Sequence, residues 1–431
     1  METIPEIIRL RVRRPVAVFG MGVSGRAVVA CLERYGIRCI AYDQRSETAF
    51  GVRHIFGRQE ASQHDLVVYS PGFAQDHPWL QTARSIGLLC LGEMDFAALF
   101  WRGVLLAVTG TNGKTTLTDF LAVALRTNGG EAVAVGNIGQ PLSCIAELAE
   151  SRGAVAVCEV SSFQAEGLQY FRPQAVLWTN FEEDHLDRYP NMGAYFAAKW
   201  NLVERLARPR LFVGEQVAQW AEKLGYVLPP YTRIVCRSEG ASLIPKDSFF
   251  TSYPQQENYL IARAYWEAEG LPLAALEQAA RRFSLRRHRL AEVTQIDGAS
   301  YWNDSKGTNF HAVEAALKTF AEPVIWIGGG KSKGGDLRGF VGRIAPRIKE
   351  AILTGETAGA LAEYCRAFGV RHRVCADLPE AVQWAHRLAK PGDTVLFSPG
   401  FSSFDQFANY AERGLCFESS VLGLKQKASG L

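Results

Sequence analysis

The sequence predicts an α/β fold with three domains in series and mostly parallel sheets. Short β-rich runs alternate with helical patterns along the whole chain, which favours parallel sheets joined by helices. Glycine-rich turns follow two of these runs, at Gly20–Gly25 and Gly110–Gly113. The length of 431 residues fits about three domains of ordinary size.

Four strands are predicted in the first hundred residues, at Val16–Phe19, Arg38–Tyr42, Leu66–Tyr69 and Leu88–Leu91. Helical patterns between them cover Ala27–Tyr35 and Trp79–Ile86. The alternation predicts a small parallel α/β domain at the N-terminus.

A dinucleotide-type glycine fingerprint, Gly20-Met-Gly-Val-Ser-Gly25, follows the first of these strands and opens a helix. Asp43 ends the next strand, where its carboxylate can accept hydrogen bonds from a ligand. Ser70-Pro71-Gly72 ends another strand and is either part of the same crevice or a plain turn. We expect a nucleotide or another diphosphate-bearing ligand here.

The central segment restarts with the apolar run Val104–Val108, followed by Thr109-Gly-Thr-Asn-Gly-Lys-Thr-Thr116 and a helical pattern. This order aims backbone N–H groups and a helix N-terminus at phosphate oxygens. Lys114 would add charge at the terminal phosphates, and Thr115 a hydroxyl ligand for Mg²⁺. Val108 replaces the first glycine of the common phosphate-loop pattern, so the loop is shorter.

Polar residues follow two further strands of this segment. Glu159 comes directly after Val155–Cys158, and Asn180-Phe-Glu-Glu-Asp-His185 comes after Ala175–Thr179. Because ligands bind beyond the carboxyl ends of parallel strands, we expect Glu159, Asp184 and His185 to converge on the phosphates and Mg²⁺. Lys199, on an apolar helical stretch, is predicted from its own context to be an exposed lysine.

Further along, a helical pattern covers Asn258–Glu269, and Ser284-Leu-Arg-Arg-His-Arg289 is interpreted as a charged hinge. Strands are then predicted at Val324–Ile327, Ala351–Leu353 and Thr394–Phe397. The predicted domains are residues 1–102, 103–285 and 286–431.

Composition excludes several classes of protein. Lys and Arg total 47 against 44 Asp and Glu, a net charge of +3, which is too balanced for nucleic-acid binding. The N-terminus lacks a signal-peptide pattern, and no apolar run reaches transmembrane length. Nine scattered cysteines without a C-x-x-C pair are typical of core residues in a reducing compartment. We expect a cytoplasmic protein that binds small molecules, without a nucleic-acid or membrane partner.

Five motifs together resemble the ATP-dependent Mur ligase family of peptidoglycan precursor synthesis. They are Thr109–Thr116, Glu159–Gln164, Asn180–Arg188, His288-Arg289 and Asn303–Asn309. The resemblance covers nearly the whole chain and is greatest for the branch that adds D-glutamate to UDP-N-acetylmuramoyl-L-alanine. It implies a Rossmann-like N-terminal domain for the UDP substrate, a P-loop-type central ATPase domain and a Rossmann-like C-terminal domain for the amino acid. A monomer is expected.

The resemblance also implies roles for individual residues. Lys114, His185 and Lys199 would be catalytic, with two Mg²⁺ ions held by Thr115, Glu159, His185 and a carbamylated Lys199. ATP would contact Gly110, Thr111, Asn112, Gly113, Lys114, Thr115, Thr116, Asn258, His288, Arg289, Asp304 and Lys306. The UDP substrate would contact Gly22, Val23, Ser24, Asp43, Gln44, Ser70, Gly72 and Asn137. D-Glutamate would contact Thr308, Lys333, Ser403, Phe404 and Tyr410.

Two positions depart from the family pattern. Ile261 stands where some relatives carry an Asn near the nucleotide, so that contact is not expected here. The loop Gly329-Gly-Lys-Ser-Lys-Gly-Gly-Asp336 offers two lysines, and alignment on its first glycines selects Lys333 over Lys331 for the amino acid.

Other functions compete with this interpretation. Another Mur ligase or a folylpolyglutamate synthase would share the motifs, although the Asp-Asn-Pro-Arg sequence of the diamino-acid-adding relative is absent. An NAD-dependent dehydrogenase would use Gly20–Gly25 and Asp43 but leaves Lys114, Glu159 and His185 unexplained. A non-catalytic nucleotide-sugar-binding regulator would not need those residues either.

Overall fold

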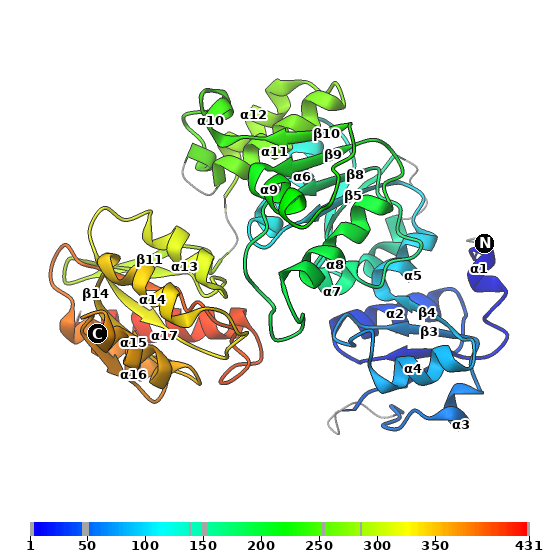
Figure 1. Cartoon of the computed structure of the whole chain (residues 1–431), viewed down its shortest axis with the longest axis horizontal. Coiled ribbons are helices and arrows are strands. Elements are labelled where there is room, and N and C mark those ends of the chain that lie inside the picture. Colours follow the sequence, from blue (N-terminus) through cyan, green and yellow to red (C-terminus); the bar gives the residue numbers. More distant parts are fainter. Residues whose placement is uncertain are drawn as a thin grey trace. The chain divides into compact units, whose positions relative to one another are not determined.

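The computed structural model describes residues 4–44, 51–137, 139–148, 153–251, 255–284 and 287–428. Three sheets with flanking helices follow one another along the chain (Figure 1). The chain forms two compact units. The larger unit contains mainly Met1–Phe181, Gly193–Thr251 and Gln255–Phe283, and the smaller mainly Glu182–Met192 and Ser284–Leu431.

The first sheet has four parallel strands in the order β2-β1-β3-β4. Its strands are β1 (Val16–Phe19), β2 (Cys39–Tyr42), β3 (Leu66–Tyr69) and β4 (Leu89–Gly92). Its helices are α1 (Glu6–Arg9), α2 (Val23–Arg34), α3 (Arg58–Ala61), α4 (Pro78–Ser85) and α5 (Glu93–Phe100). Apolar residues of α2 and α5 cover one face of the sheet, and those of α3 and α4 the other.

The second sheet has six parallel strands in the order β10-β9-β8-β5-β7-β6. Its strands are β5 (Val104–Thr109), β6 (Ala132–Gly136), β7 (Val155–Glu159), β8 (Ala175–Trp178), β9 (Leu211–Gly214) and β10 (Thr232–Val235). Its longer helices are α6 (Lys114–Thr127), α8 (Met192–Glu204), α9 (Glu215–Lys223), α11 (Gln255–Ala268) and α12 (Leu273–Arg282). Shorter helices are η1 (Leu142–Leu148), α7 (Ser162–Ala165), α10 (Arg237–Gly240), η2 (Ala241–Leu243) and η3 (Phe249–Thr251). A core formed by α6, α11 and α12 covers one face of this sheet.

The third sheet has the order β11-β12-β16-β13-β14-β15, with β11 antiparallel to β12 and its other pairs parallel. Its strands are β11 (Ala291–Ile296), β12 (Ala299–Asn303), β13 (Val324–Gly328), β14 (Ile348–Leu353), β15 (His372–Val374) and β16 (Thr394–Phe397). Its helices are α13 (Phe310–Leu317), α14 (Leu337–Ile344), η4 (Ala345–Arg347), α15 (Ala358–Ala367), α16 (Leu378–Leu388) and α17 (Tyr410–Ala428). Helices α13, α14 and α15 pack on one face of this sheet, and helices α16 and α17 pack on the other.

The predicted α/β class with mostly parallel sheets is confirmed, and each sheet is confined to one predicted range of the chain. Every strand named from the sequence is present, with ends that differ by a few residues at most. Strands β6, β9, β10, β11, β12 and β15 were not predicted from the sequence. The predicted hinge at Ser284–Arg289 includes residues 285–286, which lie outside the described ranges.

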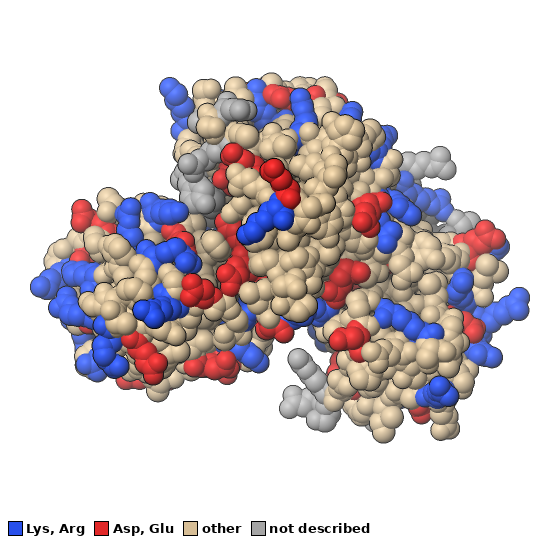
Figure 2. Space-filling model, in the orientation of Figure 1, with Lys and Arg blue, Asp and Glu red and all other residues tan. Residues whose placement is uncertain are grey.

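Surface charge is mixed. Figure 2 shows basic and acidic side chains interspersed on the visible face, in agreement with the net charge of +3. No helix within the described ranges combines the length and apolar character needed to span a membrane.

Candidate active site

The glycine fingerprint lies at the carboxyl edge of the first sheet, where three neighbouring strands end. Gly20 has φ +85°, and a Cβ on Gly25 would lie 1.6 Å from the Gly20 carbonyl oxygen. Asp43, after β2, accepts a hydrogen bond from the Met21 N–H at 2.6 Å. Ser70, after β3, donates its hydroxyl to the Gly20 carbonyl at 3.2 Å. The structure therefore brings the predicted Asp43 and Ser70 to the same glycine turn.

The phosphate loop joins β5 to α6, as predicted. Gly113 is the N-cap of α6 and has φ +81°, a left-handed conformation that favours glycine. Lys114 donates its ammonium to the carbonyl oxygens of Gly110 at 3.0 Å and Thr111 at 2.7 Å. The Lys114 side chain therefore folds back over the phosphate loop.

Glu159 lies beside the start of α6, because β7 is the neighbour of β5 in the sheet. Its carboxylate is 1% exposed and accepts hydrogen bonds from the Thr115 hydroxyl at 2.6 Å and the Asn137 amide at 2.9 Å. This network links three predicted site residues. Thr115 is expected to contact ATP and Mg²⁺, Glu159 to contact Mg²⁺, and Asn137 to contact the UDP substrate.

Two residues directly after β8, neither with a predicted role, support the phosphate loop. The Thr179 hydroxyl donates to the Asn112 carbonyl at 2.6 Å, and the Asn180 side chain accepts the Asn112 N–H at 2.8 Å. A Cβ on Gly110 would lie 1.9 Å from Thr179 Oγ1, so glycine is required there. The position of Asn180, at the start of a recognised motif, was the available signal in the sequence.

Asn258 of α11 lies against the same loop. It is 2% exposed, and a Cβ on Gly113 would come within 2.5 Å of its Oδ1 atom. Ile261, one turn further along α11, is fully buried in the core. The structure thus places Asn258, and not Ile261, beside the phosphate loop.

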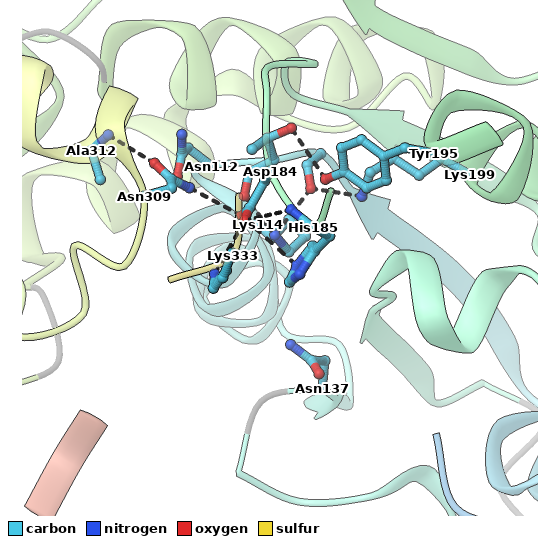
Figure 3. A network of polar contacts seen from close by, with 12 residues as sticks. Asn112, Lys114, Asn137, Asp184, His185, Tyr195, Lys199, Asn309, Ala312 and Lys333 are labelled. Atoms are coloured by element: carbon cyan, nitrogen blue, oxygen red, sulfur yellow. Dashed lines mark hydrogen bonds and ion pairs between the residues drawn. The ribbon is translucent and has the colours of Figure 1, made fainter. Parts of the chain in front are cut away.

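The prediction of an exposed Lys199, made from its own sequence context, is wrong. Lys199 is 1% exposed, not a surface lysine. Its ammonium donates to the Gly110 carbonyl at 2.9 Å and lies 5.0 Å from the centre of the Tyr195 ring (Figure 3). Helix α8 is apolar on most sides, so its sequence gave no sign of buried polar partners for a lysine. Tertiary packing supplies those partners by placing Lys199 beside the phosphate loop.

In the smaller unit, Asp184 forms the centre of a polar network (Figure 3). Its Oδ1 lies 3.1 Å from Lys333 Nζ, and its Oδ2 accepts the Asn309 amide at 3.3 Å. Burial alone would raise the pKa of Asp184, but the Lys333 ammonium and, after it, His185 hold that pKa well below its usual range. His185 has φ +57°, a strained value for a residue with a side chain.

A pocket of about 310 Å³ adjoins this network. It is lined by Glu183, Asp184, Leu186, Thr308, Asn309, Phe310, Lys333, Gly334, Gly335, Gly400 and Phe401. Two predicted amino-acid contacts, Thr308 and Lys333, line it, whereas Lys331 is exposed and forms a bridge with Ser402. The geometry therefore separates the two lysines of this loop.

The predicted nucleotide residues of the smaller unit surround the end of β12. Asp304 accepts the Ser398 hydroxyl at 2.7 Å and the Leu290 N–H at 3.2 Å. Burial raises its pKa to about 7, against the opposing effects of Ser398 and the charge of Arg289. His288 has φ +64°, and its Nδ1 lies 3.1 Å from the Glu418 carboxylate. Burial lowers the pKa of His288, and Glu418 partly opposes that shift.

Lys306 and Tyr410, predicted for the nucleotide and the amino acid respectively, lie together, with the ammonium 4.0 Å from the ring centre. Ser403 is buried, whereas Phe404 is 67% exposed. Ser403, Phe404 and Tyr410 do not line the pocket beside Lys333.

The sequence did not predict a role for Arg413 of α17. Arg413 is 3% exposed and donates to the Ser305 carbonyl at 2.9 Å and the Phe401 carbonyl at 3.1 Å. It therefore ties the loop after β12 to the loop after β16, and these loops carry predicted nucleotide and amino-acid contacts. A single arginine in a helical pattern gave no sequence signal for this role.

Among the described residues, no three His, Cys, Asp or Glu side chains form a metal-binding cluster. Mg²⁺ needs few protein ligands, and its preferred ligands are oxygens. Thr115 and Glu159 supply a hydroxyl and a carboxylate in one hydrogen-bonded pair, so these two residues fit such an ion. Glu159 belongs to the larger unit and Asp184 and His185 to the smaller, so their convergence stays a prediction.

The sequence matches two family models, the Mur ligase middle domain over residues 108–227 and the Mur ligase glutamate ligase domain over residues 288–401. A relative from Pelotomaculum thermopropionicum, named UDP-N-acetylmuramoylalanine–D-glutamate ligase, is 36% identical over 96% of this chain and 98% of its own. A relative of the same name from Trichlorobacter lovleyi is 33% identical over 96% of this chain and 99% of its own.

Solved structures share the fold at lower identity. UDP-N-acetylmuramate–alanine ligase from Thermotoga maritima superposes with a TM-score of 0.61 at 16% identity, covering 96% of this chain and 100% of its own. MurF ligase from Thermotoga maritima in complex with ADP superposes with a TM-score of 0.57 at 13% identity, covering 96% of this chain and 95% of its own.

Proposed function

Since the chain belongs to the Mur ligase family, we propose that it joins D-glutamate to UDP-N-acetylmuramoyl-L-alanine with consumption of ATP, in peptidoglycan precursor synthesis. The observation that carries this proposal is the similarity to D-glutamate ligases at 36% and 33% identity over nearly the full length of both chains. The phosphate loop with Lys114, and the network around Glu159, supply the features that ATP chemistry requires.

The reaction has two steps. A carboxylate is a poor acyl donor, so its oxygen first attacks the γ-phosphorus of ATP, and ADP leaves with the bonding electron pair. The resulting acyl phosphate is attacked at its carbonyl carbon by the amine of D-glutamate. An amide bond forms, the amine loses a proton, and inorganic phosphate leaves.

Phosphoryl transfer depends mainly on positioning and on neutralising charge. We assign Lys114 and the N–H groups of its loop to the β- and γ-phosphates, with Asn258 beside them. Asp304 would hold the ribose, and His288 and Arg289 the adenine and phosphates. The positive φ values of two predicted site residues, His185 and His288, support functional roles, because strained residues cluster at such sites.

We assign Mg²⁺ to Thr115, Glu159, His185 and a carbamylated Lys199, in two sites. When bound, the ions neutralise charge on the transferred phosphoryl group. Carbamylation would convert the Lys199 ammonium into an oxygen ligand, and the burial of Lys199 beside Gly110 supports its place near the phosphates.

For the other substrates, we assign the UDP group to the glycine turn that Asp43 and Ser70 flank. The pocket beside Thr308 and Lys333 would receive D-glutamate, with Ser403, Phe404 and Tyr410 as further contacts. The three ranges 1–102, 103–285 and 286–431 would serve the UDP substrate, ATP and the amino acid respectively. We further propose that the protein acts in the cytoplasm as a monomer.

The deciding experiment measures phosphate release from ATP with UDP-N-acetylmuramoyl-L-alanine while D-glutamate, L-alanine, L-lysine or diaminopimelate is supplied in turn. We expect release that depends on both the acceptor and D-glutamate. Release with another amino acid would favour a different Mur ligase, and no release with any of them would contradict the proposal.

A Lys114→Ala variant tests the role of the phosphate loop. We expect its turnover to fall by about two orders of magnitude or more, because transition-state charge loses a fixed cation. The matched control is Lys223→Ala, an exposed lysine at the end of α9 in the same unit. Equal activity of the two variants would remove Lys114 from the mechanism.

A further inference from the structure

The segment Glu182–Met192 follows strand β8 of the second sheet, yet it packs with the chain after Ser284 in the smaller unit. Its contacts there include the Asp187 N–H to the Lys333 carbonyl at 3.2 Å and the Asp184 pairs with Lys333 and Asn309. This segment therefore forms one wall of the pocket assigned to the amino acid.

A second charge pair fixes the same segment two residues before Asp184. The Glu182 carboxylate lies 3.0 Å from His311 Nδ1, with side-chain exposures of 14% and 32%. His311 is in the first turn of α13, and the N-cap of that helix is Asn309, which binds Asp184. Two acidic residues of the segment are thus held by two residues of one helix start.

His311 does not line the pocket, whereas its neighbours Thr308, Asn309 and Phe310 do. Any effect of His311 on a ligand is therefore indirect, and the Glu182 carboxylate that it binds gives it a route through the segment to Asp184. Asp184 in turn lies 3.1 Å from Lys333, so a shift of this carboxylate would also move the lysine.

The charges that face His311 come from three elements. Burial by itself would lower the pKa of His311, but the hydrogen bond and charge of Glu182, with Glu314 of α13, outweigh it, so the pKa is raised. Arg343 of α14 acts in the opposite direction, and it is itself paired with Glu314 at 3.0 Å. A raised pKa means that the ion pair is fully formed at low pH and is lost as the pH rises through the pKa of His311.

We propose that the Glu182–His311 ion pair is a pH-dependent positioning device that holds Asp184 and Lys333 in place for the amino-acid substrate. This inference rests on the proposed function, because it assumes that the pocket beside Lys333 receives D-glutamate. Neither residue touches the substrate, so both are positioning residues.

The test compares the KM for D-glutamate of His311→Gln with that of the wild type from about pH 6 to about pH 9. The ratio of the two values cancels the titration of the substrate amine, which is common to both enzymes. We expect the KM of His311→Gln divided by that of the wild type to be about two to five at acidic pH, which corresponds to the energy of a partly exposed ion pair. Above the pKa of His311 this ratio should fall to one. Glu182→Gln should give the same profile, and the double variant should add nothing to either.

Further measurements separate this role from a structural one. The KM values for ATP and the UDP substrate should not change, and kcat should stay within about twofold. His386→Gln is the matched control, because His386 binds Tyr301 on another part of the same unit and should give a flat ratio near one. The NMR pKa of His311 should fall in Glu182→Gln.

A ratio that does not vary with pH, or equal changes in all three KM values, would overturn the positioning role. Absence of any D-glutamate-dependent phosphate release by the wild type would instead overturn the proposed function. The two failures are therefore distinguishable.

Discussion

Lys199 shows how burial changes the meaning of a side chain. An ammonium group is costly to bury unless it is hydrogen-bonded, and Lys199 donates to Gly110 of the phosphate loop. A structural lysine and a modified, metal-binding lysine would both be buried here. The two roles differ in how the enzyme responds when a free carboxylate is supplied.

We expect Lys199→Ala to lose about two orders of magnitude in turnover, because the proposed oxygen ligand for the metal would be lost. Acetate at high concentration should restore part of the activity if the native side chain is carbamylated. Phosphate release at increasing acetate concentration measures this, with Lys114→Ala as the variant that acetate should not rescue. Normal activity of Lys199→Ala would remove the carbamate proposal.

Single residues were predictable where a motif joined a strand end to a helix start. Lys114 and Thr115 follow β5, and Glu159 ends β7, the neighbour of β5 in the sheet. Their proximity agrees with the rule that ligand sites lie at the carboxyl ends of parallel strands. The burial of Lys199 and the role of Arg413 were not predictable, because both depend on contacts between residues far apart in the chain.

At the scale of elements, most strands with continuous apolar runs were found from the sequence, but β6 and β9 were missed in spite of such runs. The more polar β10 was missed as well. The hairpin β11–β12 was missed although its turn, Asp297-Gly298, carries a known hairpin signal. Both turn residues have positive φ, at +49° and +77°, as such a turn requires. Polar and apolar residues alternate in β11, which lacks the continuous apolar run that marked most of the strands predicted from the sequence.

The loop after β13 contains a matched pair of lysines for an experiment. We expect Lys333→Ala to raise the KM for D-glutamate about tenfold or more, since the proposed charge-assisted contact to the substrate carboxylate would be lost. Lys331→Ala, in the same loop but exposed, should change this KM by less than about threefold. The KM for D-glutamate of each variant is the measurement, and the reverse order of effects would assign Lys331 to the substrate.

At the scale of the whole molecule, two buried polar groups stabilise different units. In the larger unit, the Asp95 carboxylate accepts three backbone N–H groups, from Gln169, Tyr170 and Phe171, at 2.6–2.9 Å. It therefore joins α5 of the first sheet to the chain before β8. In the smaller unit, Arg413 joins two loops in a comparable way.

We expect the chain to unfold in two calorimetric transitions, because its contacts divide into two units. Asp95→Ala should lower the midpoint of one transition, since three buried N–H groups lose their acceptor, and Arg413→Lys should lower the other. Asp76→Ala, at an exposed aspartate, is the control. A single transition with equal calorimetric and van't Hoff enthalpies would contradict this expectation.

The packing of Glu182–Met192 with the smaller unit also limits how such a protein can be recombined with its relatives. A chimera that exchanges only the chain after Ser284 would separate Glu182 and Asp184 from the partners with which they occur here. Transplanting amino-acid preference between homologues therefore requires both stretches from the same parent, although the 91 intervening positions can come from the other.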